Sequence, residues 1–340
     1  MYKSWPRSIV FLIGIGCFSM GLNRDIGLKT PSNFPQVVYD FSNNPYSQKK
    51  FDLGKKLFYD GLLSSDGSVS CGFCHQQASS FTHHGHEISH GVEGRLGKRN
   101  APPIINVIWQ KTFFWDGGVN HLDFVPMNAI ANPNEMNESL ANVLSKLNQK
   151  EEYRNLVKSA FGVEQISTTE FLQALSIYMA SLISAEAKYD KVIRKEGHQF
   201  SASEEAGFLL FKQKCASCHA TDLFTDGSYR NNGVSNDYRF DKGREEITLD
   251  SADRGKYKVP TLRNIDFTAP YMHDGSLKTI DEVLNHYSDQ MKAVPALDPL
   301  FAREGKPGID LSMQNKEDLK NFLHTLNDTA FLKNRFFSEY

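Results

Sequence analysis

The chain has 340 residues, of which 40% are hydrophobic and 23% are charged, and its formal net charge is −2. These values exclude an intrinsically disordered or collagen-like chain, and they leave no basic field that would attract nucleic acid. The length suits roughly two domains with buried cores. The five cysteines are too few for a disulfide scaffold, and they form two close pairs and one odd residue.

The first segment is typical of an export signal. Lys3 and Arg7 precede a short apolar run, and polar residues follow it. Because this run is too short to cross a bilayer as a stable helix, residues 1–22 are predicted to be a secretory signal peptide rather than a permanent anchor. Cys17, the odd cysteine, follows a segment similar to a bacterial lipoprotein cleavage site, so a lipid anchor on this residue is an open alternative.

A short helical pattern precedes each cysteine pair. The first covers residues 51–58 and leads to the Cys-Gly-Phe-Cys-His signature at 71–75. The second covers residues 206–211 and leads to the Cys-Ala-Ser-Cys-His signature at 215–219. Repeats this far apart are typical of two duplicated domains, and they are too widely spaced for a solenoid.

The periodicity elsewhere is also helical. Asn137 is predicted to cap one helix, Ser167 opens a capping box before a long helix that reaches Leu182, and Ser201 opens a second capping box. Leucines and a phenylalanine at 319–326 form the apolar stripe of a last helix. No clear series of alternating strands is present. We therefore predict an all-α fold with long ordered loops and a domain boundary near residues 195–201.

The two Cys-x-x-Cys-His signatures carry the strongest chemical signal. Two thiols three positions apart can both bond to the vinyl groups of one haem, and the adjacent histidine then presents its imidazole to the iron. Zinc and thiol redox chemistry are weaker alternatives, because the pairs are too far apart for a zinc ribbon and no βαβ pattern accompanies them. We predict two covalently bound haem c groups, held by Cys71, Cys74 and His75 and by Cys215, Cys218 and His219, with both histidines as proximal iron ligands.

Eight blocks that span most of residues 50–330 point to one family. They are Leu-Gly-Lys-Lys-Leu-Phe (53–58), the signature at 71–75, Lys-Arg-Asn-Ala-Pro (98–102), Phe-Trp-Asp-Gly (114–117), Asn-Pro-Asn-Glu-Met (132–136), the signature at 215–219, Val-Pro-Thr-Leu-Arg-Asn (259–264) and Thr-Ala-Pro-Tyr-Met-His-Asp-Gly (268–275). In content and order they resemble the bacterial dihaem cytochrome c peroxidases. That superfamily includes the enzymes that mature the tryptophan tryptophylquinone cofactor of methylamine dehydrogenase.

The resemblance implies two cytochrome c-like haem domains, which we place at residues 35–196 and 197–335. The N-terminal haem would be the peroxidatic centre and the C-terminal haem the electron-transfer centre. Glu135 falls on the family's catalytic glutamate, which moves a proton between the two peroxide oxygens. Trp115 falls on the tryptophan between the haems and would act as an electron relay. From the residues alone, Glu135 could instead charge the first turn of a helix, and Trp115 could fill a core.

The family usually holds a calcium ion between its domains. The matching positions are Asn100, through its side chain, and Thr268 and Pro270, through their carbonyl groups. Oxygen ligands suit a hard cation. Both segments could also be plain turns.

The distal ligand of the peroxidatic haem departs from the family pattern. Many members place a removable histidine there, but the matching position here is Val92. The neighbouring loop contains four histidines, of which His90 is the best candidate ligand, and the others are His83, His84 and His86. A loop of this kind can also be mobile and simply solvated. Without a histidine ligand the haem would be five-coordinate and active without prior reduction.

The distal side of the C-terminal haem is the second departure. Tyr287 occupies the position where the peroxidases usually carry a methionine and the maturation enzymes carry a tyrosine. An apolar helical stripe from Ile280 would turn the phenol inward, with Met291 one turn further on the same face. A tyrosinate lowers the potential of the iron, whereas a thioether raises it. We predict Tyr287 as the iron ligand, with Met291 as the alternative if Tyr287 is only a core residue.

These features predict an exported, periplasmic dihaem peroxidase that reduces hydrogen peroxide to water with electrons from a small cytochrome c or cupredoxin. A dihaem oxidase of a protein substrate is the first alternative, and Tyr287 favours it. A non-catalytic electron-transfer cytochrome is the second, and Glu135 argues against it. The resemblance implies a homodimer. We expect no nucleic-acid partner and no membrane contact except through a lipid anchor on Cys17.

Overall fold

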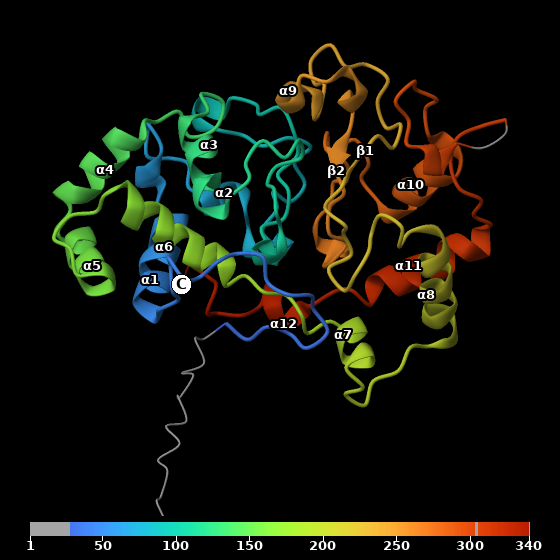
Figure 1. Ribbon diagram of the computed structural model, residues 1–340, viewed down its shortest axis with the longest axis horizontal. Coiled ribbons are helices and arrows are strands. Elements are labelled where there is room, and N and C mark those ends of the chain that lie inside the picture. The colour runs from blue at the N-terminus through green and yellow to red at the C-terminus, as the bar shows by residue number, and fades with distance from the viewer. Residues whose placement is uncertain (1–27, 303–304, 340) are drawn as a thin grey trace, which may run out of the picture.

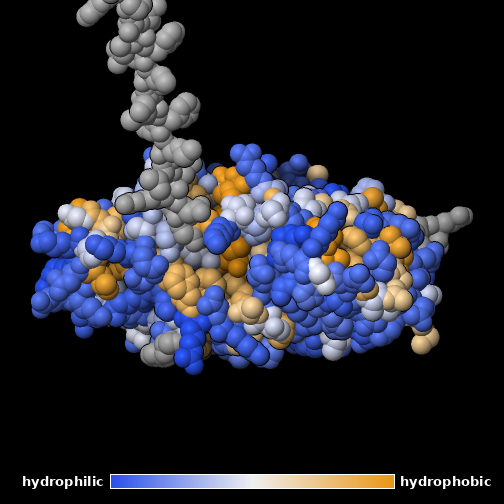
Figure 2. Space-filling view, turned by 90° about the horizontal axis from the view of Figure 1, so that it is seen from below, coloured by the Kyte–Doolittle hydropathy of each residue, from blue (hydrophilic) through white to orange (hydrophobic). Residues whose placement is uncertain are grey.

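A computed structural model of the protein describes residues 28–302 and 305–339, so the predicted signal peptide and Cys17 lie outside the described residues. The described chain forms two helical lobes that lie side by side (Figure 1). None of its helices has the length and apolar composition that crossing a membrane requires. Seen from below, the surface is mainly hydrophilic, with hydrophobic residues exposed in separate groups (Figure 2).

The fold is mainly α-helical, as the sequence predicted. The helices are α1 (Gln48–Tyr59), α2 (Cys71–Cys74), α3 (Val125–Ala131), α4 (Leu140–Gln149), α5 (Glu151–Phe161), α6 (Thr168–Ala180), α7 (Lys188–Ile193), α8 (Ala202–Lys214), α9 (Glu245–Thr248), α10 (Ile280–Asn285), α11 (Met313–His324) and α12 (Thr329–Leu332). Two short antiparallel strands, β1 (Tyr229–Arg230) and β2 (Tyr257–Lys258), pair Tyr229 with Lys258. This small ribbon is the one departure from the predicted class within the described residues.

The predicted helix starts are correct at two of three places. Ser167 and Ser201 each form the expected capping box. In each box the serine hydroxyl and the carboxylate of the glutamate three residues later accept hydrogen bonds from backbone N–H groups at the start of the helix. The prediction for Asn137 is wrong, because Ser139 caps α4 and accepts a hydrogen bond from Asn142 N at 3.2 Å. Asn137 has a positive φ of 50°, a conformation that asparagine tolerates just outside a helix. The long helix α6 ends at Ala180, two residues before the predicted end.

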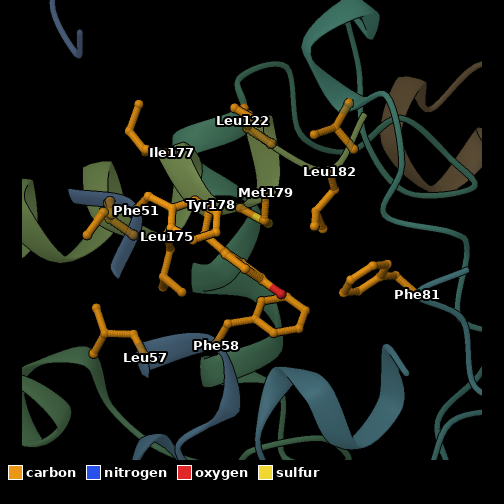
Figure 3. Close-up of a cluster of buried hydrophobic side chains, with 14 of the residues drawn as sticks. Phe51, Leu57, Phe58, Phe81, Leu122, Leu175, Ile177, Tyr178, Met179 and Leu182 are labelled. Carbon is orange, nitrogen blue, oxygen red and sulfur yellow. The ribbon is translucent and has the colours of Figure 1, made fainter. Parts of the chain in front are cut away.

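The first lobe is built on α1 and α6. Gly54 lets the two helices approach closely, since a Cβ at this position would lie 2.0 Å from the carbonyl oxygen of Ala174. Fully buried side chains from both helices, including Phe58 and Tyr178, fill the space beside this contact (Figure 3). The core therefore depends on one glycine and on aromatic side chains that fit around it.

The second lobe repeats this arrangement with α8 and α11. A Cβ at Gly207 would lie 2.0 Å from the carbonyl oxygen of Asp318, and Phe211 and Phe322 are buried beside the contact. Gly54 and Gly207 are the glycines of the two helical patterns that precede the cysteine pairs. The sequence repeat thus corresponds to a repeated mode of helix packing.

The chain crosses back to the first lobe after α11. Phe331 and Phe337 belong to the hydrophobic cluster of the first lobe, and the hydroxyls of Tyr59 and Tyr178 each lie 2.8 Å from the carbonyl oxygen of Phe337. The last residues of the predicted 197–335 domain therefore pack on the other lobe. The division into two haem domains at residues 35–196 and 197–335 remains a prediction.

Candidate functional site

The first Cys-x-x-Cys-His signature forms the single helical turn α2. Ser70 caps this turn by accepting a hydrogen bond from Phe73 N at 3.2 Å. The Nδ1 atom of His75 lies 2.7 Å from the carbonyl oxygen of Phe81. A ring nitrogen that donates to a carbonyl leaves the other nitrogen, Nε2, unprotonated and able to bind a metal. Burial lowers the pKa of His75 to about 4, so the ring is neutral.

The second signature repeats this local geometry. Cys215 caps the C-terminus of α8, and Cys218 is buried. The Nδ1 atom of His219 lies 3.0 Å from the carbonyl oxygen of Phe224, and burial lowers the pKa of this ring as well. Both histidines therefore have Nδ1 beside a backbone carbonyl oxygen that lies a few residues further along the chain.

A cavity of about 600 Å³ opens beside the second signature. Its wall contains Cys215, Cys218 and His219 together with many apolar side chains, and its volume falls in the range of ordinary cofactor pockets. Two thiols and one correctly oriented imidazole on the wall of a largely apolar cavity are the groups that a c-type haem requires. The residues present therefore fit this cofactor.

The cavity also contains Tyr287. This residue lies in a π-helical turn, His286–Gln290, that continues α10. Met291, the alternative ligand, is buried but is not among the residues that line the cavity; it packs against Gly233. The methionine that does line the cavity is Met272. The side chain of Asn232, which the sequence did not single out, lies between this methionine and Tyr287.

Glu135 lies close to the first signature. Burial raises the pKa values of the Cys71 and Cys74 thiols, and the negative charge of Glu135 adds to this effect. Asn132 donates a hydrogen bond from Nδ2 to Glu135 Oε1 at 2.9 Å, and the other carboxylate oxygen has no hydrogen-bond partner among the described side chains. Burial raises the pKa of Glu135. The carboxyl group is thus held at one oxygen and available at the other.

The histidine-rich loop packs against this region. The His83 and His86 rings stack with centroids 4.1 Å apart, and the His90 ring lies 4.6 Å from that of His86. His83 is only 3% exposed and its Nδ1 atom has no hydrogen-bond partner, so the expectation of a solvated loop is wrong for this residue. The carbonyl oxygen of His90 lies 3.5 Å from Cys74 Sγ. The loop therefore stays close to the first signature, and which of its imidazoles binds iron remains a prediction.

Trp115 lies at the junction of the lobes. Its indole N–H donates to the carbonyl oxygen of Asn100 at 2.8 Å, and its own carbonyl accepts from the Lys258 backbone at 2.7 Å. Trp115 forms part of the wall of the cavity beside the second signature. The structure thus places the predicted relay residue beside the second signature and in contact with both lobes.

The three predicted calcium ligands are brought together at the same cavity wall. Asn100, Thr268 and Pro270 all line it. Asn100 donates from Nδ2 to the carbonyl oxygens of His86 and Glu87, both at 3.1 Å, which leaves Oδ1 for a cation. Within the described residues, no group of three or more histidine, cysteine or acidic side chains is arranged to hold a metal. A calcium site here would therefore depend on amide and carbonyl oxygens, and it remains a prediction.

Comparisons with known proteins agree with this geometry. The family described as di-haem cytochrome c peroxidase matches residues 48–198. The methylamine utilization protein MauG of Methylorubrum extorquens is 33% identical over 88% of this chain and 84% of its own length, and the cytochrome c551 peroxidase of Nitrosomonas europaea is 32% identical over 71% and 73%. A crystal structure of a MauG-like protein associated with microbial copper homeostasis superimposes with a TM-score of 0.82 at 32% identity and covers 91% of this chain and 98% of that one. The relatives of this chain thus include both cytochrome c peroxidases and MauG proteins. Members of their family are oxidoreductases with two c-type haems. The chain therefore belongs to the di-haem cytochrome c peroxidase family.

Proposed function

We propose that the protein is an exported, periplasmic peroxidase that reduces hydrogen peroxide to water with two electrons from a small cytochrome c or cupredoxin. The observation that carries the proposal is the half-buried carboxyl group of Glu135 beside the first Cys-x-x-Cys-His signature, fixed at one oxygen by Asn132. A non-catalytic electron-transfer cytochrome has no use for such a group. Relatives named cytochrome c peroxidases support the choice of peroxide and of a cytochrome donor.

The chain's own residues would divide the work. Cys71, Cys74 and His75 would hold a haem, whose iron supplies the site for peroxide binding and the redox chemistry. The free oxygen of Glu135 would take a proton from one peroxide oxygen and return it to the other, which then leaves as water. Because this role begins with the carboxylate form and burial raises its pKa, we expect the acidic limb of the pH profile to lie above the usual range of a glutamate.

Electrons would reach this site through the second lobe. Cys215, Cys218 and His219 would hold the second haem, and Trp115 on the wall of its cavity would relay electrons towards the first lobe. Asn100, Thr268 and Pro270, which line the same wall, would hold a calcium ion that stabilises it. The hydrogen bond from Trp115 to the backbone of Asn100 would then couple the position of the relay to that of the ion.

One observation favours a second candidate, a dihaem oxidase of a protein substrate. Tyr287 reaches the cavity of the second signature whereas Met291 does not. A tyrosinate ligand lowers the potential of an iron and stabilises its higher oxidation states. The relatives named MauG support the same alternative.

The deciding experiment is peroxide-dependent oxidation of reduced cytochrome c by the haem-loaded protein. We expect Glu135→Gln to reduce turnover by about 10²- to 10⁴-fold, the usual contribution of a general acid–base group. Glu138→Gln is the matched control: Glu138 lies three residues further along the same loop and forms an ion pair with Lys146 at 2.9 Å, so its loss should leave turnover within a few-fold of the wild type. Equal turnover of Glu135→Gln and wild type would contradict the proposal. Peroxide-induced changes in the haem spectrum without oxidation of cytochrome c would favour the second candidate.

A further inference from the structure

Asn232 lies between two side chains that could both approach a metal in the cavity beside the second Cys-x-x-Cys-His signature. Its side-chain nitrogen Nδ2 is 3.3 Å from Tyr287 Oη and 3.4 Å from Met272 Sδ. All three residues line the cavity together with the second Cys-x-x-Cys-His signature. One amide therefore contacts an oxygen donor and a sulfur donor at the same time.

Chemistry fixes the direction of these hydrogen bonds. A thioether sulfur accepts hydrogen bonds but cannot donate them, so the NH₂ group of Asn232 must face Met272. That group has two hydrogens, and the second is directed to the oxygen of Tyr287. A donor aimed at the phenol oxygen stabilises negative charge there and orients the oxygen, as outer partners of metal ligands do.

The backbone of Asn232 also contacts the π-helical turn that contains Tyr287. Its carbonyl oxygen lies 2.9 Å from Nε2 of His286, the residue that directly precedes Tyr287. On the other side, the carbonyl oxygen of Tyr287 accepts a hydrogen bond from Ile309 N at 2.8 Å. This turn is π-helical, a form often found at functional sites, and Met272 has a positive φ of 73°, which is unusual for a residue with a side chain. The polar contacts and the unusual backbone conformations thus occur at one place.

We propose that Asn232 is a positioning residue of the second haem site: it would hold the Tyr287 oxygen in place as a ligand of the iron and engages the Met272 sulfur, so that this iron would take an oxygen donor rather than a sulfur donor. The inference rests on the haem-binding part of the proposed function and needs no peroxide turnover. Asn232 itself acts through Tyr287 and does not bind the iron.

The test is resonance Raman spectroscopy of the oxidised holoprotein, which detects vibrations of an iron-bound phenolate, together with redox titration of both haems. We expect Tyr287→Phe to abolish the phenolate bands and Asn232→Leu to abolish or shift them. Asn232→Asp, which is nearly the same shape but replaces the donor by an acceptor, should have the same effect. Tyr287→Phe and Asn232→Leu should raise the potential of the second haem, because the anionic oxygen ligand is lost or weakened. Asn232→Asp should raise it less, because the new negative charge of the carboxylate lowers the potential and opposes this effect.

Two methionine variants serve as matched controls. Met272→Leu removes the sulfur but keeps the amide, and Met291→Leu changes a buried methionine that does not line the cavity. Both should keep the phenolate bands. Unshifted bands and an unchanged potential in both Asn232 variants would overturn the proposal, and so would a wild-type protein without phenolate bands. A pyridine haemochrome assay separates these results from failure of the proposed function, because absence of the second haem would overturn both.

Discussion

Arg263 and Asp190 form an ion pair whose two side chains are completely buried. The guanidinium contacts both carboxylate oxygens, at 2.7 and 2.9 Å, and its Nε atom donates to the carbonyl oxygen of Asp222 at 2.7 Å. Asp190 also accepts from Asn33 Nδ2 at 3.1 Å. A buried pair of this kind stabilises the protein only while all its hydrogen-bonding groups have partners, because each charge has been removed from water.

Replacing Asp190 by alanine should therefore be strongly destabilising. The change leaves the Arg263 guanidinium buried without its counter-charge, which typically costs about 3–5 kcal/mol in the free energy of unfolding. Urea denaturation followed by circular dichroism measures this loss. The double variant Asp190→Ala/Arg263→Met should recover part of it, since no buried charge remains.

Glu164→Ala provides the control. It breaks an ion pair in which the Glu164 side chain is 77% exposed and the Lys158 side chain 61% exposed, so it should leave the denaturation midpoint unchanged. An Asp190→Ala protein as stable as this control would show that the buried pair does not stabilise the fold.

Arg263 belongs to a sequence block that the family resemblance identified, but its partner is 73 residues away and no local pattern marks it.

At the level of single residues, the sequence could predict chemistry that depends on neighbours in the chain. The two Cys-x-x-Cys-His signatures determine local turns, and both proximal histidines are oriented by nearby carbonyl oxygens. Contacts across the cavity were not predictable. A regular helical repeat placed Met291 on the same face as Tyr287, but the π-helical turn changes the spacing and Met291 has an extended backbone conformation. The methionine that lines the cavity is instead Met272, in a different loop.

At the level of helices, capping motifs were predicted well and helix pairing was not. Ser167 and Ser201 cap their helices because the serine and glutamate of each box lie close in sequence. The pairing of α1 with α6 and of α8 with α11 depends on glycines that allow close packing. Their role cannot be recognised until the partner helix is known. Gly54 and Gly207 stand where a backbone carbonyl of the partner helix leaves no space for a Cβ atom.

Gly207→Ala should consequently destabilise the second lobe, although alanine is the better helix former by about 1 kcal/mol. Its Cβ would lie 2.0 Å from the Asp318 carbonyl oxygen and 2.8 Å from the Phe322 side chain, so α8 and α11 must move apart. We expect a lower melting temperature and, because Cys215 directly follows α8, a change in the spectrum of the second haem.

The neighbouring substitution Ala206→Gly separates packing from helix propensity, because Ala206 is exposed on the same helix. It should cost only about the 1 kcal/mol expected from propensity. If Gly207→Ala raised the melting temperature instead, close packing at this glycine would not limit stability.

At the level of the whole molecule, the C-terminal segment joins the two lobes. It leaves α11 in the second lobe, forms α12 and ends against the first, where the Phe336 ring stacks on that of Phe51 with centroids 4.2 Å apart. The sequence prediction assigned the part of this segment up to residue 335 to the C-terminal domain, whereas Phe331 packs in the hydrophobic cluster of the first lobe. Which lobe the segment packs on depends on aromatic contacts between opposite ends of the chain, and no periodic pattern records those.

Removing the residues after Lys333 should therefore weaken the lobe at the other end of the chain. Tyr59 and Tyr178 would both lose the Phe337 carbonyl oxygen, and the buried Phe337 side chain would leave a gap in the first hydrophobic cluster. Loss of a buried phenylalanine typically costs about 3–5 kcal/mol. Because Tyr59 packs directly against Gly72 of the first signature, we expect the spectrum of the first haem to change while that of the second stays the same.

The full-length variant Phe337→Ala should reproduce most of the loss in melting temperature, whereas Glu339→Ala, near the end of the same segment, should not. A truncated protein whose first haem and melting temperature match the wild type would show that each lobe is stable without this connection.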